Sequence, residues 1–258
     1  MNGMINMKIL LTNDDGYNSD GIQALYKVLS IDHDVFFAAP LTQKSSAGHA
    51  VSLFKPMKLK KITDGYAIDG TPADCVKVAL FGLYKDIKFD LVVSGINNGA
   101  NMGCDIFYSG TVAAAREGLL NDIPGIACSM QRLGEDKDYY AAANFINSLI
   151  AKLFGSILKE QIVLNINFPL GGVYDNVKVT HLGKRVYNDT IYFEEKGNDK
   201  FASIVGDCVS FLHCKGSDLN CVDEGGVSIT PLSNEYFVPH VVDDLVKMTE
   251  SLSLTLQV

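Results

Sequence analysis

Long apolar runs and basic side chains are both scarce in this 258-residue sequence. No run approaches the roughly 18 apolar residues that cross a bilayer, so a membrane-spanning helix is not expected. The 22 lysines and arginines are outnumbered by 30 aspartates and glutamates, which gives a net charge of −8. A surface of this sign repels nucleic acid polymers, and we exclude them as partners. A phosphorylated substrate therefore has to be held by local groups or by a metal ion.

Cysteine pairs with metal-binding spacing are missing as well. The six cysteines, at positions 75, 104, 128, 208, 214 and 221, form no Cys-x-x-Cys pair and no tight cluster with histidine. A structural zinc site is therefore not expected. Residues 1–7 lack the basic region and long apolar core of a secretory signal. Free thiols without an export signal predict a cytoplasmic protein.

Short apolar runs alternate with helical patterns through the first two thirds of the chain. We expect strands at residues 8–11, 34–38, 91–93, 126–128 and 162–164. We expect helices at residues 19–29, from Thr71-Pro72 through 80, at 111–120 and at 139–153. Strands that are apolar on both faces and alternate with helices predict an α/β fold. This fold is a three-layer, Rossmann-like, doubly wound and mainly parallel sheet.

The character of the sequence changes after Pro169. Glycine, aspartate and short alternating segments at 177–180, 209–212 and 227–230 predict a β-rich extension, with a final helix near 241–252. We therefore divide the chain into a Rossmann-like core, residues 1–170, and a C-terminal extension, residues 171–258.

The first of three polar loops follows the first expected strand, at residues 13–16. Adjacent carboxylates at Asp14 and Asp15 suit a hard cation such as Mg²⁺ or Mn²⁺. A plain turn accounts for the same residues. A dinucleotide-binding fold would carry a Gly-x-Gly-x-x-Gly motif here, and the acidic residues would repel a pyrophosphate. Nicotinamide dinucleotides are therefore not expected.

The second loop, residues 44–49, follows the second expected strand. Its two serines, Ser45 and Ser46, offer hydroxyl oxygens that can complete a coordination shell, although a solvated loop is the favoured explanation of this segment taken alone. His49 has the spacing of neither a catalytic triad nor a metal cluster. We interpret it as a loop or packing residue.

The third loop, residues 94–103, contains three glycines and three asparagines. It leads to Ser109 and Thr111 at the start of an expected helix, whose free N–H groups suit a phosphate. Ser109 as a helix cap is the alternative. Because the three loops end strands of one sheet, they should face one crevice. Their carboxylates, hydroxyl and amide groups and anion pocket predict metal-assisted phosphoryl transfer to water.

With these motifs the sequence resembles the SurE family of stationary-phase survival proteins, which are metal-dependent nucleotidases. The resemblance rests on residues 9–16, 39–40, 70–76, 94–97, 101–103, 108–115, 164–167 and 227–232. It implies one divalent metal ion per subunit, Mg²⁺ or Mn²⁺, with four ligands: Asp14, Asp15, Ser45 and Asn97. Ser46 is the alternative hydroxyl to Ser45. The positions that match the family's phosphate-facing residues are Asn101, Ser109, Gly110 and Thr111.

The activity implied by the resemblance is that of a 5′-nucleotidase. It would hydrolyse nucleoside 5′- and 3′-monophosphates to nucleoside and phosphate, with short polyphosphate as a further substrate. The resemblance also implies a homodimer or homotetramer in which C-terminal segments exchange, so the extension is expected to take part in oligomerisation. Gly225-Gly226 stands where the family commonly has Gly-Tyr, which leaves dimer or tetramer open.

The mechanism that we expect is in-line attack by water, with Asp14, Asp15 and Asn101 as the catalytic residues and Asp14 as the favoured proton acceptor. A covalent aspartyl-phosphate is less favoured, because the usual phosphatase pair has its second aspartate two positions after the first. Two hypotheses from other classes are kept. One is a nucleotide-binding regulator without turnover, and the other is a structural protein that acts through its β-rich tail.

Overall fold

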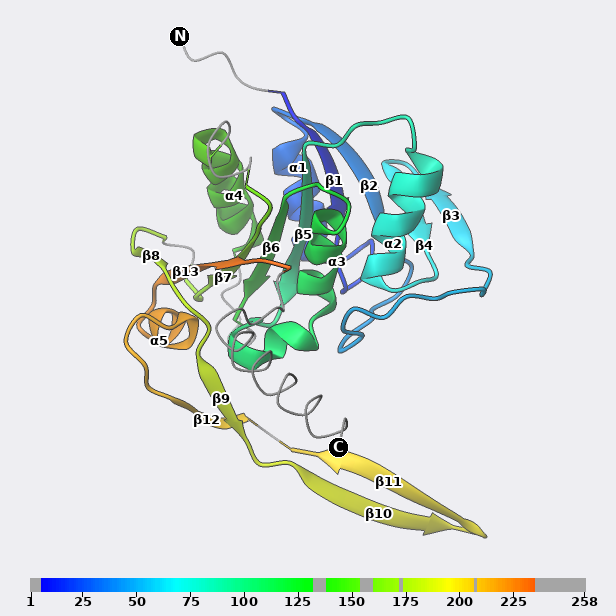
Figure 1. The fold of residues 1–258 in the computed structure, drawn as a ribbon, viewed down its shortest axis with the longest axis vertical. Helices are drawn as coiled ribbons and strands as arrows, with labels where there is room; N and C mark the ends of the chain where they lie inside the picture. Colours follow the sequence, from blue (N-terminus) through cyan, green and yellow to red (C-terminus); the bar gives the residue numbers. More distant parts are fainter. Residues whose placement is uncertain (1–5, 132–137, 154–159, 172–173, 207, 235–258) are drawn as a thin grey trace, which may run out of the picture.

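The computed structural model describes residues 6–131, 138–153, 160–171, 174–206 and 208–234 (Figure 1). The helix expected at 241–252 lies outside these residues. The main sheet has nine strands in the order β3-β4-β2-β1-β5-β6-β7-β13-β8. Its strands are β1 (Lys8–Thr12), β2 (Asp34–Pro40), β3 (Leu59–Ile62), β4 (Gly65–Ile68), β5 (Leu91–Asn98), β6 (Gly125–Met130), β7 (Val163–Phe168), β8 (Val177–Val179) and β13 (Val227–Leu232).

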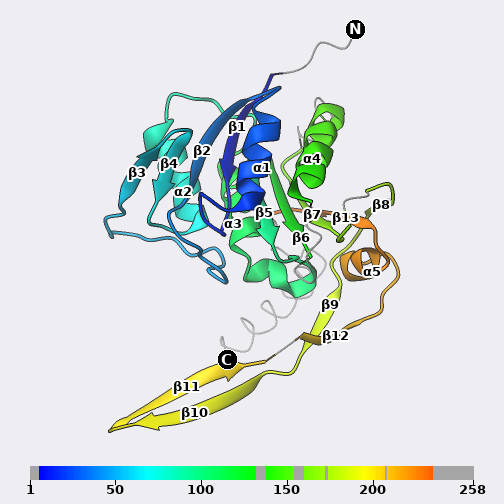
Figure 2. The same ribbon diagram turned by 180° about the vertical axis from the view of Figure 1, so that it is seen from behind.

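The centre of the sheet, β4-β2-β1-β5-β6-β7, is parallel throughout. Four helices cover it: α1 (Asp20–Leu29), α2 (Pro72–Val78), α3 (Gly110–Leu119) and α4 (Tyr139–Leu153). Figures 1 and 2 show α1 and α4 on one face and α2 and α3 on the other. The predicted α/β class is thereby confirmed. None of the helices in the described part of the chain is long and apolar enough to cross a membrane.

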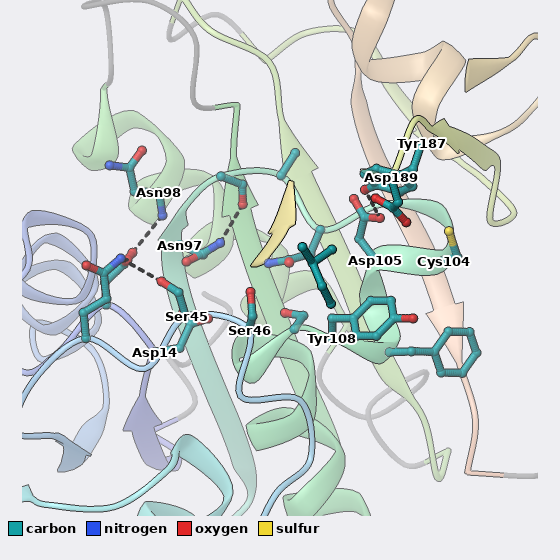
Figure 3. A pocket seen from close by; sticks show the side chains of 18 residues that line it. Asp14, Ser45, Ser46, Asn97, Asn98, Cys104, Asp105, Tyr108, Tyr187 and Asp189 are labelled. Carbon is teal, nitrogen blue, oxygen red and sulfur yellow. Dashed lines mark hydrogen bonds between the residues drawn. The ribbon is translucent and has the colours of Figure 1, made fainter. Parts of the chain in front are cut away.

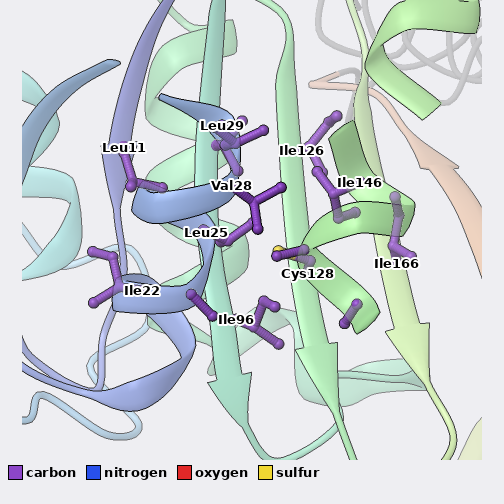
Figure 4. Close-up of a cluster of buried hydrophobic side chains, with 14 of the residues drawn as sticks. Leu11, Ile22, Leu25, Val28, Leu29, Ile96, Ile126, Cys128, Ile146 and Ile166 are labelled. Carbon is purple, nitrogen blue, oxygen red and sulfur yellow. The ribbon is translucent and has the colours of Figure 1, made fainter. Parts of the chain in front are cut away.

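The largest core lies between the sheet and the helices α1 and α4 (Figure 4). Ile22, Leu25 and Leu29 recur at helical spacing along α1, and all three side chains are fully buried. They pack in one cluster with strand residues such as Leu11 and Ile126. Burial of each such side chain is worth about 1.5–3 kcal/mol, so this stripe fixes the helix against the strands that carry the polar loops.

Strand β5 is longer than the sequence predicted. It was expected to end at residue 93 but continues to Asn98, so the glycine-rich segment begins inside the strand. The pairing with β6 shifts register between Ser94 and Asn97. At Gly95, φ is +136° and an added Cβ would lie 2.3 Å from the carbonyl oxygen of Cys128, so only glycine permits this approach. As a result, strand pairing and not a free loop holds Asn97.

The antiparallel β3–β4 hairpin at one edge of the sheet was not predicted. Its solvent-facing strand β3 is mostly exposed and reads Leu-Lys-Lys-Ile, which is too short and polar to stand out as a strand.

The expected β-rich segments are present as β8, β12 and β13. β13 is antiparallel to β7 and parallel to β8, so two strands from beyond residue 170 join the main sheet. The proposed division at residue 170 stays a prediction. The remaining strands, β9 (Lys184–Tyr187), β10 (Thr190–Lys196), β11 (Asp199–Val205) and β12 (Cys208–Leu212), form two two-stranded sheets that extend away from the main sheet (Figure 1). A short helix, α5 (Asp218–Asp223), leads back to β13.

Candidate active site

The predicted site residues lie at the topological switch point of the sheet, next to strand β1. Strand β1 pairs with β2 on one side and with β5 on the other, and ligands bind beyond the carboxyl ends of strands at such a switch point. A cavity of about 990 Å³ opens there. It is lined by all four predicted metal ligands, by Ser46, and by Asn101 and Ser109 (Figure 3). The expectation of one shared crevice is confirmed.

Asp14 is a buried carboxylate that forms no ion pair within the described part of the chain. Its side chain is 6% exposed, and Oδ1 accepts a 2.6 Å hydrogen bond from the Thr111 hydroxyl. Burial raises the pKa of Asp14 to about 6; the Thr111 hydrogen bond lowers it, and the neighbouring charge of Asp15 raises it. No ion pair to Asp14 or Asp15 is found among the described residues. A buried carboxylate in this setting fits a cation-binding role.

Asp15 connects the three polar loops. Its Oδ2 accepts the N–H of Asn98 at 2.8 Å, which ties the β1 turn to the end of β5. Its Oδ1 lies 3.4 Å from the amide nitrogen of Gln43, and the same nitrogen donates to the Ser45 hydroxyl at 2.8 Å. Sequence reasoning missed Gln43, a polar loop residue without a motif of its own.

Asn97 and the two serines supply neutral oxygen atoms. The Asn97 amide nitrogen donates to the carbonyl oxygen of Gly99 at 2.6 Å, which leaves Oδ1 as an acceptor in the cavity. Both Ser45 and Ser46 line the cavity, so either can be the ligand. No group of three or more His, Cys, Asp or Glu side chains that could hold a metal ion is found in the described part of the chain. Two carboxylates with hydroxyl and amide oxygens fit a hard divalent cation.

The amino terminus of α3 lies against the Asp14 carboxylate. The Ser109 hydroxyl accepts the N–H of Val112 at 3.1 Å, so it caps the helix while lining the cavity. A Cβ at Gly110 would lie 2.9 Å from Cβ of Asp14, so glycine is required for this packing. The Thr111 hydroxyl is turned to Asp14. The phosphate-binding role assigned to these residues stays a prediction.

Asn101 is held by a buried polar network that the sequence did not reveal. Its N–H donates to Oδ1 of Asn167 at 2.8 Å, and its side-chain amide donates to the Ser129 hydroxyl at 2.8 Å. Its carbonyl oxygen accepts from the amides of Asn165 and Asn167. Both of these asparagines are fully buried in β7. Two asparagines in an otherwise apolar strand were the available signal.

His49 ties the serine loop to the helices. Its Nε2 lies 2.9 Å from a carboxylate oxygen of Glu117 in α3, and Lys77 of α2 lies 2.8 Å from the other oxygen. Glu117 is only 2% exposed. Burial acts to raise the pKa of Glu117, but the hydrogen bonds and charges of His49 and Lys77 outweigh it and lower the value. The interpretation of His49 as a loop or packing residue is consistent with this contact.

Comparison with known proteins identifies one family that this chain resembles in both sequence and structure. A family model described as "Survival protein SurE" matches residues 9–189. The 5′-nucleotidase SurE of Desulfitobacterium hafniense is 43% identical over 96% of this chain and 98% of that protein. The 5′-nucleotidase SurE of Syntrophomonas wolfei is 40% identical over 96% of both. In the crystal structure of the SurE protein from Aquifex aeolicus the same fold recurs, with a TM-score of 0.81 and 36% identity over 94% of this chain and 99% of that one.

Proposed function

The chain belongs to the SurE family, and we propose that it is a metal-dependent 5′-nucleotidase that hydrolyses nucleoside 5′- and 3′-monophosphates. The observation that carries this proposal is the buried Asp14 carboxylate, which lies beside Asp15 and against the amino terminus of α3 and forms no ion pair with any described residue. This arrangement combines a cation site with an anion site at the ligand-binding edge of the sheet.

The metal site consists of oxygen atoms from Asp14, Asp15, Asn97 and one of the two serines, Ser45 or Ser46. Mg²⁺ and Mn²⁺ both suit this donor set. One such ion, when bound, would offset negative charge on the transferring phosphoryl group.

The protein's own groups then orient the substrate. In this proposal the N–H groups at the start of α3, at Gly110 and Thr111, donate to phosphate oxygens, and Ser109 and Asn101 line the cavity beside them. A water molecule forms a bond to phosphorus opposite the ester oxygen, and the phosphorus–oxygen ester bond breaks. Oδ2 of Asp14 accepts one proton of the attacking water, and the leaving nucleoside oxygen takes up a proton from solvent water.

The proposal also covers the cellular location of the protein and its self-association. We place the protein in the cytoplasm, in keeping with the free thiols of Cys75, Cys104, Cys128, Cys214 and Cys221. We also propose a homodimer or homotetramer that uses the C-terminal extension. The exposed apolar side chains of β10 and β11 support this assembly.

The experiment that tests the activity is phosphate release from nucleoside 5′- and 3′-monophosphates with Mg²⁺ or Mn²⁺, against a chelated control. We expect release only with metal, and its loss in Asp14→Asn with the fold retained by circular dichroism. Full activity in Asp14→Asn would contradict the metal-site assignment. Saturable nucleotide binding without phosphate release would instead favour a non-catalytic regulator.

A further inference from the structure

Strand β7 contains two buried asparagines that the proposed function leaves without a role. Leu164, Ile166 and Phe168 belong to the core against α1 and α4, so Asn165 and Asn167 point to the opposite face of the sheet. Both asparagines are fully buried. A buried carboxamide costs free energy unless it is hydrogen-bonded, and an apolar side chain would serve a purely structural strand as well. What these two side chains bind therefore indicates their purpose.

Both asparagines bind the backbone of Asn101. Oδ1 of Asn167 accepts the N–H of Asn101 at 2.8 Å, and Nδ2 of Asn167 donates to the carbonyl oxygen of Asn101 at 3.1 Å. Nδ2 of Asn165 donates to the same carbonyl oxygen at 2.8 Å. Side chains of β7 thus hold both backbone polar groups of a residue that lines the cavity.

The side chain of Asn101 is oriented by the neighbouring strand. Its amide nitrogen donates to the Ser129 hydroxyl at 2.8 Å, and Ser129 lies directly beside Asn167 in the register of β6 and β7. Ser129 is itself fully buried. An amide nitrogen has two hydrogens, so one of them is left for a ligand in the cavity. Two adjacent strands therefore fix both the backbone and the side chain of Asn101.

The segment that contains Asn101 is held independently at its other end. Asp218, fully buried at the start of α5, accepts the N–H of Gly103 at 2.8 Å and the N–H of Gly183 at 2.7 Å. Because Asp218 fixes the chain two residues beyond Asn101, loss of an asparagine from β7 should displace Asn101 without releasing the whole segment.

We propose that Asn167, assisted by Asn165, is a positioning residue for the nucleotidase reaction that acts through Asn101. The inference rests on the proposed function and on the phosphate-binding role predicted for Asn101. Neither β7 asparagine is among the described residues that line the cavity, so neither touches the substrate. A displacement of about 1 Å in a positioning group can cost about 100-fold in rate. Precise placement of Asn101 is a reason to keep polar side chains in this strand.

The first test is Asn167→Leu, which keeps a similar volume and removes both hydrogen bonds to Asn101. We expect kcat/KM for AMP to fall by up to about 100-fold. The affinity for Mn²⁺, measured by calorimetric titration, should stay unchanged, because the predicted metal ligands lie on the β1 turn, the serine loop and β5. Equal losses of Mn²⁺ affinity and activity would reveal a general disturbance of the site and overturn the positioning role.

Ser228→Ala is the matched control for this substitution. Ser228 is fully buried and lies beside Asn167 in the register of β7 and β13. Its hydroxyl has no hydrogen-bond partner among the described residues. Its removal alters the same buried region without changing a contact to Asn101, so activity should equal that of the wild type. A loss as large as that in Asn167→Leu would overturn the inference.

A double-mutant cycle with Asn101→Ala tests whether Asn167 acts through Asn101. Once Asn101→Ala has removed the amide, Asn167→Leu should cost little further activity. Losses that multiply would place the action of Asn167 elsewhere. Asn165→Leu is the second variant, in case Asn167→Leu does not fold by circular dichroism. It removes one of two donors to the Asn101 carbonyl oxygen, so it should fold and lose less activity, again only when Asn101 is present. Full activity in a folded Asn167→Leu or Asn165→Leu protein would overturn the proposal.

Failure of the proposed function can be told apart from failure of this inference. If the wild type is active and Asn101→Ala keeps full activity, the inference is wrong while the nucleotidase assignment stands. If folded, Mn²⁺-loaded wild type releases no phosphate from AMP or the other nucleoside monophosphates, the hydrolase assignment is wrong. Calorimetric titration with inorganic phosphate then decides the second question. Weaker phosphate binding in Asn167→Leu than in the wild type and Ser228→Ala would support the positioning role, and equal or absent binding in all three would overturn it.

Discussion

At the scale of single residues, the Thr111 hydroxyl is the group that fixes the position of Asp14. It donates a 2.6 Å hydrogen bond to Oδ1 of Asp14. Both side chains are buried, so no water can replace the bond at low cost. Loss of a hydrogen-bond partner that orients a metal ligand typically lowers metal affinity by about 10–100-fold.

We therefore predict that Thr111→Val weakens Mn²⁺ binding about tenfold or more, because valine keeps the shape and removes the donor. Thr111→Ser retains the hydroxyl and is the matched control, which should bind Mn²⁺ like the wild type. Calorimetric titration with Mn²⁺ measures the effect without relying on turnover. Unchanged affinity in Thr111→Val would show that Asp14 is not held for a cation.

At the scale of elements, Glu117 joins three parts of the chain. It lies in α3, contacts Lys77 of α2 and anchors the serine loop through His49. Because its pKa is lowered in the folded protein, its contribution to stability is present above the ordinary glutamate value of 4.5 and is lost as pH falls through the folded value.

Glu117→Gln should accordingly lower the free energy of unfolding by about 1–3 kcal/mol at pH 7, since a buried charge-assisted pair is broken. The difference from the wild type should shrink below pH 4.5, where the ordinary carboxyl is protonated. Urea denaturation at pH 7 and pH 4 measures both values. Glu224→Gln removes an exposed ion pair with Lys178 and should leave stability unchanged. A pH-independent effect of Glu117→Gln would contradict this account.

The elements also show what the sequence could and could not predict. Apolar runs and helical spacing located the central strands and α1 to α4, because burial on both faces leaves a strong pattern. The same patterns predicted an end of β5 at residue 93, whereas the strand continues to Asn98. Glycine at position 95 indicates a turn when only the sequence is considered, but in the structure it permits the close approach of the strand to Cys128. Motifs located Asp14 and Asn97. The supports of the site, such as Asn167 and Glu117, arise from contacts between distant segments, which no local pattern records.

At the scale of the whole molecule, the ribbon of β10 and β11 has no core of its own. On one face Ile191 pairs with Ile204 and Phe193 pairs with Ala202, and all of these residues are exposed. An isolated two-stranded ribbon is marginally stable in water. A second copy of the chain would cover this apolar face and stabilise the ribbon. Ile204 and Asp189 also line the cavity, so the placement of the ribbon bears on the site.

The proposed assembly gives the prediction for this scale. Phe193→Asp places a charge on the apolar face and should shift the protein from dimer or tetramer to monomer, because an unpaired carboxylate is costly to bury. Sedimentation velocity at several concentrations measures the change, and circular dichroism checks the fold. Lys196→Ser alters a polar residue of the same strand and should leave the assembly intact. A wild-type monomer would contradict the assembly directly. An unchanged oligomer in Phe193→Asp would place the interface elsewhere, and the ribbon would then serve the cavity alone.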